Sequence, residues 1–251
     1  MEAIYRETFP VRAAECDFTG NMRLSALFIA MQEGAEKSAE TLGAGRFSLL
    51  SRNLFFALSR IHTEMERPPR LGETVVHETW PGVSNHFFYP RFHRFFLEDG
   101  TKLVSAAALW VTMDMNERKI VTPSSAGFTF PDTSLIEPPC RLPGKPKEPG
   151  VAAESFETRT QYEDLDINGH VNNARYISWL ANALGEEAFS GRHIRSLVAG
   201  YEKEIRGGHR VTHHLERKED AFFYRVTDET GAKCFSASGE FVSRSAGSRE
   251  E

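Results

Sequence analysis

Three polar side chains with the chemistry for hydrolysis lie close together in the second half of the chain. Asp166, Asn168 and His170 alternate along a short loop that a helical pattern follows. A carboxylate or an imidazole can activate water, and an amide can donate a hydrogen bond to an oxygen that gains negative charge. If the loop is extended, the alternation points all three side chains to one side. The loop is therefore a candidate catalytic site.

The same stretch also has a purely structural interpretation. Asp166 and Asn168 can form turns, and Asn172 or Asn173 can cap the following helix. Capping explains one asparagine, but it does not explain a histidine and two further polar groups in alternation. The start of the helix also offers unpaired backbone amides at its positive end, which suit a developing negative charge. We predict that Asn172, Asn173 and Tyr176 contact the substrate.

A weaker copy of this loop lies 149 positions earlier in the chain. Asp17 matches the aspartate of the second loop, whereas Thr19 replaces the amide and Asn21 replaces the imidazole. A repeat of this kind indicates a duplicated domain if the flanking elements follow it. Because only the second loop keeps the full polar set, we predict one site per chain.

The elements that follow the two loops repeat as well. We align residues 58–65 with residues 198–205, which pairs Glu64 with Glu204 and implies nine more residues between helix and strand in the first half. Both loops precede an apolar pattern with helical spacing. Its positions are Leu24, Leu27, Phe28 and Met31 in the first half, and Tyr176, Ile177, Leu180 and Leu184 in the second.

A hairpin also occurs in both halves. Residues 98–106 match residues 229–237, with Gly100 and Gly231 at the turn, where a positive φ is favourable for glycine. Each half then has one helix and five or six strands. One long helix wrapped by a curved antiparallel sheet is typical of the hotdog fold. We predict an α+β protein with two tandem hotdog domains that form a pseudo-dimer within one chain.

A proline-rich segment separates the two halves and predicts an extended linker. It holds half of the chain's twelve prolines: Pro131, Pro138, Pro139, Pro143, Pro146 and Pro149. The predicted organisation is an N-terminal domain over residues 1–128, a linker over 129–150, a C-terminal catalytic domain over 151–243 and a flexible tail over 244–251.

Composition excludes several other classes of protein. A net charge of -5 argues against nonspecific binding to nucleic acid, which needs a basic surface. No apolar run is long enough to span a bilayer, and the N-terminus lacks the pattern of a signal peptide. Three scattered cysteines do not form a disulfide framework. His209, His213 and His214 lack a metal-site pattern because neighbouring strand residues face opposite ways. We expect a cytoplasmic protein without cofactor or metal.

Three segments of the sequence resemble the acyl-acyl carrier protein (acyl-ACP) thioesterases of bacteria and plants. They are residues 55–80, residues 166–176 with the pattern Asp-x-Asn-x-His-Val-Asn-Asn-x-x-Tyr, and residues 201–204. The resemblance extends from about residue 4 to residue 243. It implies hydrolysis of fatty acyl-ACP with release of free fatty acid, and acyl carrier protein as the partner. No transit peptide is expected here, so the bacterial form is the nearer match.

The resemblance also implies a catalytic set of Asp166, Asn168, His170 and Glu204, with Glu204 on a following strand. One hypothesis has Asp166 and Glu204 activating water, Asn168 and a helix amide binding the oxyanion, and His170 polarising the thioester. Direct attack by a carboxylate is the alternative. A cysteine nucleophile is disfavoured because Ile205 stands where some plant relatives have cysteine.

The resemblance further implies that the first half houses the acyl chain. The candidate lining consists of the helix residues Leu24, Leu27, Phe28 and Met31 together with Leu49, Leu50, Leu54, Phe55 and Phe56.

Other functions remain open at this point. An acyl-CoA thioesterase, a noncatalytic acyl-binding hotdog protein and a hotdog dehydratase would all suit the fold. Acyl chain length is not predictable from the sequence, and a homodimer of chains is possible.

Overall fold

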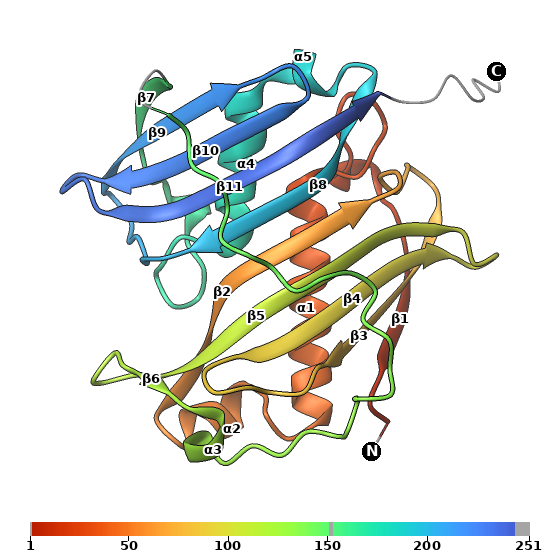
Figure 1. Cartoon of the computed structure of the whole chain (residues 1–251), viewed down its shortest axis with the longest axis vertical. Coiled ribbons are helices and arrows are strands. Elements are labelled where there is room, and N and C mark those ends of the chain that lie inside the picture. The colour runs from red at the N-terminus through yellow and green to blue at the C-terminus, as the bar shows by residue number, and fades with distance from the viewer. Residues whose placement is uncertain (1, 151–152, 244–251) are drawn as a thin grey trace.

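The computed structural model describes residues 2–150 and 153–243 (Figure 1). The predicted tail over 244–251 lies outside the described residues. Eleven strands form one antiparallel sheet, in which neighbouring strands run in the order β1-β3-β4-β5-β2-β8-β11-β10-β9-β7, with β6 pairing β5. The strands of the first half are β1 (Tyr5–Pro10), β2 (Leu54–Met65), β3 (Thr74–Pro81), β4 (Tyr89–Leu97), β5 (Lys102–Asp114) and β6 (Ile120–Val121). Those of the second half are β7 (Glu154–Arg159), β8 (Arg192–Tyr201), β9 (Arg210–Arg217), β10 (Ala221–Asp228) and β11 (Lys233–Ser243).

Two long helices, α1 (Leu24–Thr41) and α4 (Asn173–Leu184), lie on the same side of this sheet and confirm the predicted helical patterns. The side chain of Asn172 caps α4 by accepting a hydrogen bond from the Ala174 amide at 2.9 Å. Gly185 ends the same helix at a φ of 80°, which glycine adopts without strain. The short helices are α2 (Arg46–Leu50), α3 (Pro123–Ala126) and α5 (Glu186–Phe189).

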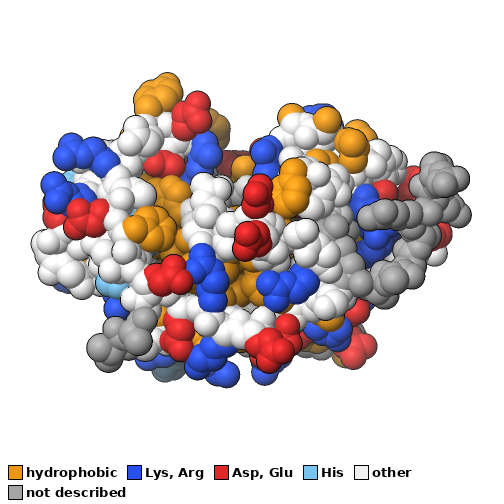
Figure 2. Space-filling model, turned by 90° about the horizontal axis from the view of Figure 1, so that it is seen from above, with side chains coloured by type: hydrophobic (Ala, Val, Ile, Leu, Met, Phe, Trp, Pro, Cys, Tyr) orange, Lys and Arg blue, Asp and Glu red, His pale blue; other side chains and the backbone are white. Residues whose placement is uncertain are grey.

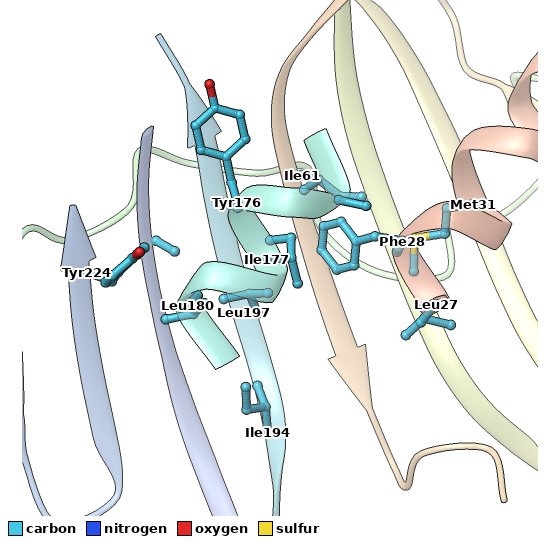
Figure 3. Packing of buried hydrophobic residues seen from close by; sticks show 14 of the residues in the cluster. Leu27, Phe28, Met31, Ile61, Tyr176, Ile177, Leu180, Ile194, Leu197 and Tyr224 are labelled. Atoms are coloured by element: carbon cyan, nitrogen blue, oxygen red, sulfur yellow. The ribbon is translucent and has the colours of Figure 1, made fainter. Parts of the chain in front are cut away.

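The core of the molecule runs without interruption between the two long helices and the sheet. Figure 3 shows Phe28 pointing from α1 towards Ile177 of α4, with Ile61 of β2 beside them. All three side chains are at most 3% exposed and belong to one cluster that spans both halves. The helices therefore contribute apolar side chains to a shared core rather than to two separate ones.

The two halves also join through their backbones. Strands β2 and β8 pair antiparallel from Arg60 opposite Gly200 to Glu64 opposite Ser196. This pairing makes one continuous sheet of the two halves, and each half wraps its own part of the sheet around its own long helix. The chain therefore has two tandem hotdog domains that form a pseudo-dimer, as the sequence predicts.

Backbone hydrogen bonds confirm one alignment of the repeat and correct another. The amides of Glu66 and Glu202 donate to the carbonyls of Leu103 and Cys234, each at 2.9 Å, so the hairpin alignment is right. The strand alignment that paired Glu64 with Glu204 is wrong.

The amides of Met22 and Val171 donate to the carbonyls of Pro69 and Ile205, each at 2.8 Å. The position equivalent to Glu204 is therefore Pro68. The longer insertion that contains α2 accounts for the error, because it adds four more residues than the strand alignment implied.

The segment between α3 and residue 150 contains no helix or strand among the described residues, in agreement with an extended linker. Figure 1 shows it, in green, crossing the face of the sheet opposite the helices. Cys140 packs there in a cluster with Trp80 and Phe92, and the amide of Lys147 donates to Ser238 Oγ at 3.0 Å. The linker thus contacts both halves on the outer face of the sheet. The exact domain boundaries stay a prediction.

Within the part of the chain that the structure describes, no helix is both long enough and apolar enough to cross a membrane.

Candidate active site

The candidate loop is a tight turn, and the prediction of an extended loop is wrong. The carbonyl of Asp166 accepts the amide of Gly169 at 3.0 Å, and Gly169 has a φ of 74°. The Asp166 carboxylate accepts hydrogen bonds from the backbone amides of Asn168 at 2.8 Å and His170 at 3.2 Å. The Asn168 side-chain amide lies 3.4 Å from the other oxygen. Asp166 therefore holds the turn closed by acting as acceptor for its backbone.

The degenerate loop of the first half folds into the same turn. The Asp17 carboxylate accepts the amides of Thr19 at 2.8 Å and Asn21 at 3.3 Å, and the Asp17 carbonyl accepts the amide of Gly20 at 3.0 Å. The Asn21 side chain donates to Thr19 Oγ1 at 2.8 Å, so the two substituted side chains satisfy each other. The aspartate is common to both turns, whereas the amide and imidazole distinguish the second.

His170 and Glu204 meet at the open side of the second turn. The His170 Nε2 atom lies 3.6 Å from Oε2 of Glu204. Glu204 lies in the loop after β8, not on a strand as the sequence analysis predicts, because β8 ends at Tyr201. An isolated backbone β-bridge between His170 and Arg206 brings this loop beside the turn. The arrangement places a carboxylate against one nitrogen of the imidazole.

The environment of His170 favours its neutral form. Partial burial lowers the pKa of His170 below its usual 6.5, the nearby Asp166 carboxylate raises it, and the charges of Arg118 and Arg206 lower it further. A neutral imidazole keeps one nitrogen able to accept a proton. His170 is therefore suited to act as a base near neutral pH.

Side chains from the first half complete the site. Arg118, in the hairpin between β5 and β6, forms an ion pair with Oε2 of Glu204 and lies over the ring of Phe55 at 4.9 Å. Arg46 of α2 approaches Asn168, with Nη1 3.4 Å from Oδ1. Sequence reasoning missed both arginines, since neither belongs to the repeated loop. The sequence shows positive charge at these two positions but no spacing that relates either of them to the second turn.

Comparison with known proteins identifies the family. The model of the acyl-ACP thioesterase N-terminal domain matches residues 2–124, and that of the acyl-ACP thioesterase C-terminal domain matches residues 148–243. The chain belongs to the acyl-ACP thioesterase family. A dodecanoyl-[acyl-carrier-protein] hydrolase of Cinnamomum camphora is 28% identical over 216 residues, covering 80% of this chain and 56% of the relative. The chain thus spans little more than half of that curated relative.

Two solved structures share the fold over nearly their whole length. An acyl-ACP thioesterase from Bacteroides thetaiotaomicron superposes with a TM-score of 0.86 at 23% identity, covering 96% of this chain and 98% of that one. The 12:0-ACP thioesterase from Umbellularia californica has a TM-score of 0.82 at 23% identity, covering 97% and 99%. These likenesses establish the tandem hotdog architecture of this acyl-ACP thioesterase family member.

The other residues predicted to contact the substrate in this family member take part in helix capping, hydrogen bonding or core packing. Asn172 is the helix cap described above, and the Asn173 carbonyl accepts a hydrogen bond from the Tyr201 hydroxyl at 3.2 Å. Tyr176 is buried and stacks on Phe235 at 5.0 Å. Substrate contact by these three residues stays a prediction.

The four residues of α1 in the predicted acyl lining divide into two groups. Leu27, Phe28 and Met31 are buried in the core, so an acyl chain could reach them only if the core opened. Leu24 instead borders a small cavity of about 40 Å³ beside the degenerate turn, which Asp17 and Phe189 of the second half also line. The lining therefore also stays a prediction.

A second, larger hollow is not lined by any of the candidate catalytic residues. It is a polar groove of about 820 Å³ over β9 and β10, on the side of the sheet opposite α4. Its three cations are engaged within the protein: Arg210 with Glu157 at 3.3 Å, and Arg225 and Lys233 with Glu148 at 3.4 and 2.6 Å. This charged lining is unsuited to a fatty acyl chain.

Burial and local hydrogen bonds account for two of the cysteines and for two of the clustered histidines. Burial raises the pKa of Cys140 to about 12 and that of Cys234 to about 11, so both thiols are poor nucleophiles. His213 uses both ring nitrogens on hydroxyls, with Nε2 2.7 Å from Thr158 and Nδ1 2.5 Å from Tyr224. His214 lies on the opposite face of β9, near Thr227, as strand alternation predicts.

Proposed function

We propose that this chain hydrolyses the thioester of fatty acyl-ACP and releases free fatty acid. The observation that carries the proposal is the pairing of His170 with Glu204 beside Asn168, in a chain that matches both domains of the family. The names of its relatives describe hydrolysis of acyl groups from acyl carrier protein. Because the chain covers about half of the curated relatives, substrate and partner belong to the proposal.

The geometry favours a mechanism in which His170 is the base. Its neutral imidazole takes a proton from water, and the water oxygen attacks the thioester carbonyl carbon. Glu204 stabilises the imidazolium that forms, and the Asn168 amide donates to the oxyanion. The carbon–sulfur bond then breaks, and the thiolate recovers the proton from the imidazolium.

Asp166 has a supporting part in this mechanism. Its carboxylate already accepts two backbone amides within the turn, so it is less available to activate water than His170 is. The earlier hypothesis, with Asp166 and Glu204 as the activating pair, therefore has less support than the His170–Glu204 pair. Attack by Glu204 itself, through an anhydride, would be revealed by transfer of ¹⁸O from labelled water into the enzyme during a single turnover.

Basic side chains near the site support an acidic carrier protein as partner. Arg46 and Arg206 lie beside the turn, where Arg46 approaches Asn168 and the charge of Arg206 acts on His170. Other arginines are engaged internally, such as Arg118 with Glu204 and Arg94 with Glu78. Figure 2 shows acidic and basic side chains interspersed on the face seen from above, without a broad basic surface there. We propose that the carrier contacts the arginines beside the site. Cytoplasmic location and a homodimer stay predictions.

Release of free thiol from a panel of acyl chains, each offered on acyl carrier protein and on coenzyme A, tests the proposal. We expect the wild-type protein to prefer the carrier protein, and His170→Ala to lose activity by at least about 10²-fold. Asp166→Ala should lose a similar amount because the turn opens and misplaces Asn168 and His170. Asn21→Ala, in the degenerate turn, is the matched control and should retain activity.

Each outcome of this panel has a distinct meaning. Preference for coenzyme A would make the protein an acyl-CoA thioesterase that uses the same residues. An enoyl thioester as product would indicate a dehydratase. Absence of thiol release from every substrate would contradict hydrolysis and favour a binding role. Thermal melts of each variant separate loss of chemistry from loss of folding.

A further inference from the structure

One charged side chain of the first half reaches the reacting groups of the second. Arg118 pairs with Oε2 of Glu204, the same oxygen that lies 3.6 Å from His170 Nε2. The guanidinium also lies over the ring of Phe55, 4.9 Å from its centroid. One carboxylate oxygen thus lies between a fixed cation from the first half and the imidazole of the second.

The backbone beneath Arg118 is organised to hold it there. Asp114 accepts the amides of Asn116 and Glu117 at 2.8 Å each, and its own amide donates to the Lys119 carbonyl at 2.9 Å. These bonds close a hairpin over residues 115–118. Its last residue, Arg118, has a φ of 56°, a conformation that glycine adopts freely and other residues adopt under strain.

An arginine at a strained position needs an explanation beyond the hairpin itself. Glycine would complete the same turn with less strain, so the hairpin alone does not require an arginine. Strained residues concentrate where a side chain must be aimed at a functional group. Arg118 is such a strained residue, and its guanidinium pairs with Glu204.

We propose that Arg118 is a positioning residue that holds the Glu204 carboxylate against His170, so that the catalytic half depends on the hairpin of the first half. This inference rests on the proposed function, because it assigns Arg118 to the same site. The ion pair fixes which oxygen of Glu204 faces the imidazole. It also places a positive charge near His170, which like that of Arg206 lowers the pKa of the ring, against the opposite effect of Asp166, and so disfavours protonation in the free enzyme.

The substitution Arg118→Gly tests this role without disturbing the fold. Because glycine relieves the backbone strain, we expect a melting temperature equal to or above that of the wild type. We expect kcat to fall by about 10- to 100-fold, the effect of a misplaced catalytic group, with KM nearly unchanged. Arg118→Lys keeps the charge and should recover part of the loss. Lys119→Ala, the neighbouring residue that pairs with Glu117, is the control and should match the wild type.

A double-mutant cycle checks that Arg118 acts through Glu204. In the Glu204→Gln background, Arg118→Gly should cause little further loss of kcat, because the group it positions is already gone. Full additivity of the two losses would overturn the proposal, as would wild-type kcat in Arg118→Gly alone.

A titration of His170 by NMR gives a readout that requires no turnover. Removal of Arg118 takes a positive charge away from a ring that faces Asp166, Glu204 and Arg206, so the pKa of His170 should rise. His170→Gln identifies the resonance. An unchanged titration would contradict the positioning role even if no substrate is ever hydrolysed, whereas absence of thiol release in the wild type would contradict only the proposed function.

Discussion

Asp17 and Asp166 close the same turn in the two halves of the chain. Each carboxylate accepts the amide two residues later at 2.8 Å and the amide four residues later at 3.2 to 3.3 Å. The aspartate is therefore present where the rest of the candidate catalytic set is absent. Its shared function is to shape the turn, and any chemical function of Asp166 must be measured separately.

Asp166→Asn separates the two functions, because the amide oxygen can still accept the hydrogen bonds of the turn while the negative charge is lost. We expect turnover within about tenfold of the wild type, in contrast to the loss of at least about 10²-fold that removal of a general base causes. Asp17→Asn is the matched control for stability. If Asp166→Asn is as inactive as Asp166→Ala, the carboxylate itself takes part in the chemistry.

Alkylation should leave the protein active. Burial raises the pKa of all three thiols, but Cys16 is only partly buried whereas Cys140 and Cys234 are buried, so iodoacetamide should label Cys16 first. Cys16 lies beside the degenerate turn, away from His170. Mass spectrometry of the labelled protein, followed by thiol-release assays, checks this expectation. Inactivation that substrate prevents would instead point to a cysteine in the reaction.

Acid should destabilise the protein through its buried histidines. Burial lowers the pKa of His213 to about 4, so the unfolded state, with a pKa of 6.5, binds the proton first as pH falls. The stability contributed by the neutral ring is complete above pH 6.5 and is lost towards pH 4. We expect His213 to account for about 2 kcal/mol between about pH 7 and about pH 5.

Urea unfolding at the two pH values measures this difference in the wild type and in His213→Gln. The variant should lose part of the pH dependence, whereas His86→Gln, in an exposed loop, should keep all of it. Equal pH dependence in wild type and His213→Gln would show that the ring does not contribute.

Phe28→Ala distinguishes a core residue from the wall of an open pocket. Phe28 is 2% exposed and packs against Ile61 and Ile177, so truncation should cost about 3–5 kcal/mol of unfolding free energy. Phe47→Ala on α2, where the ring is 80% exposed, should cost less than about 0.5 kcal/mol. Denaturant melts measure both. A small cost at Phe28 would mean that its surroundings are already open enough to admit an acyl chain.

The fold could be predicted from the sequence because its sequence pattern occurs twice in the chain. The apolar spacing at Phe28 and Ile177 and the glycine turns at Gly100 and Gly231 are local signals that two independent copies reinforce. The alignment of the repeated strands could not be predicted from the sequence. The insertion that contains α2 changes the spacing between helix and strand, and Pro68 in place of a carboxylate removes the residue that would have marked the match.

The site could be predicted in part. His170 and Glu204 do meet, although neither their distance nor the loop position of Glu204 follows from spacing. The predicted extended geometry of the loop is wrong, because alternation of polar residues suits both an extended segment and a turn closed by aspartate. Arg118 could not be found, since its approach depends on tertiary packing of a hairpin 86 residues away in the chain.

The pairing of β2 with β8 has an evolutionary consequence. Two identical subunits joined along such strands would have to change both copies of a residue whenever they changed one. Covalent fusion removes that constraint, so the turn at Asp17 can carry Asn21 where the second turn carries an imidazole, and the hairpin at Arg118 can serve the opposite turn. A residue on one half of this interface can thus change while the equivalent residue on the other half stays the same.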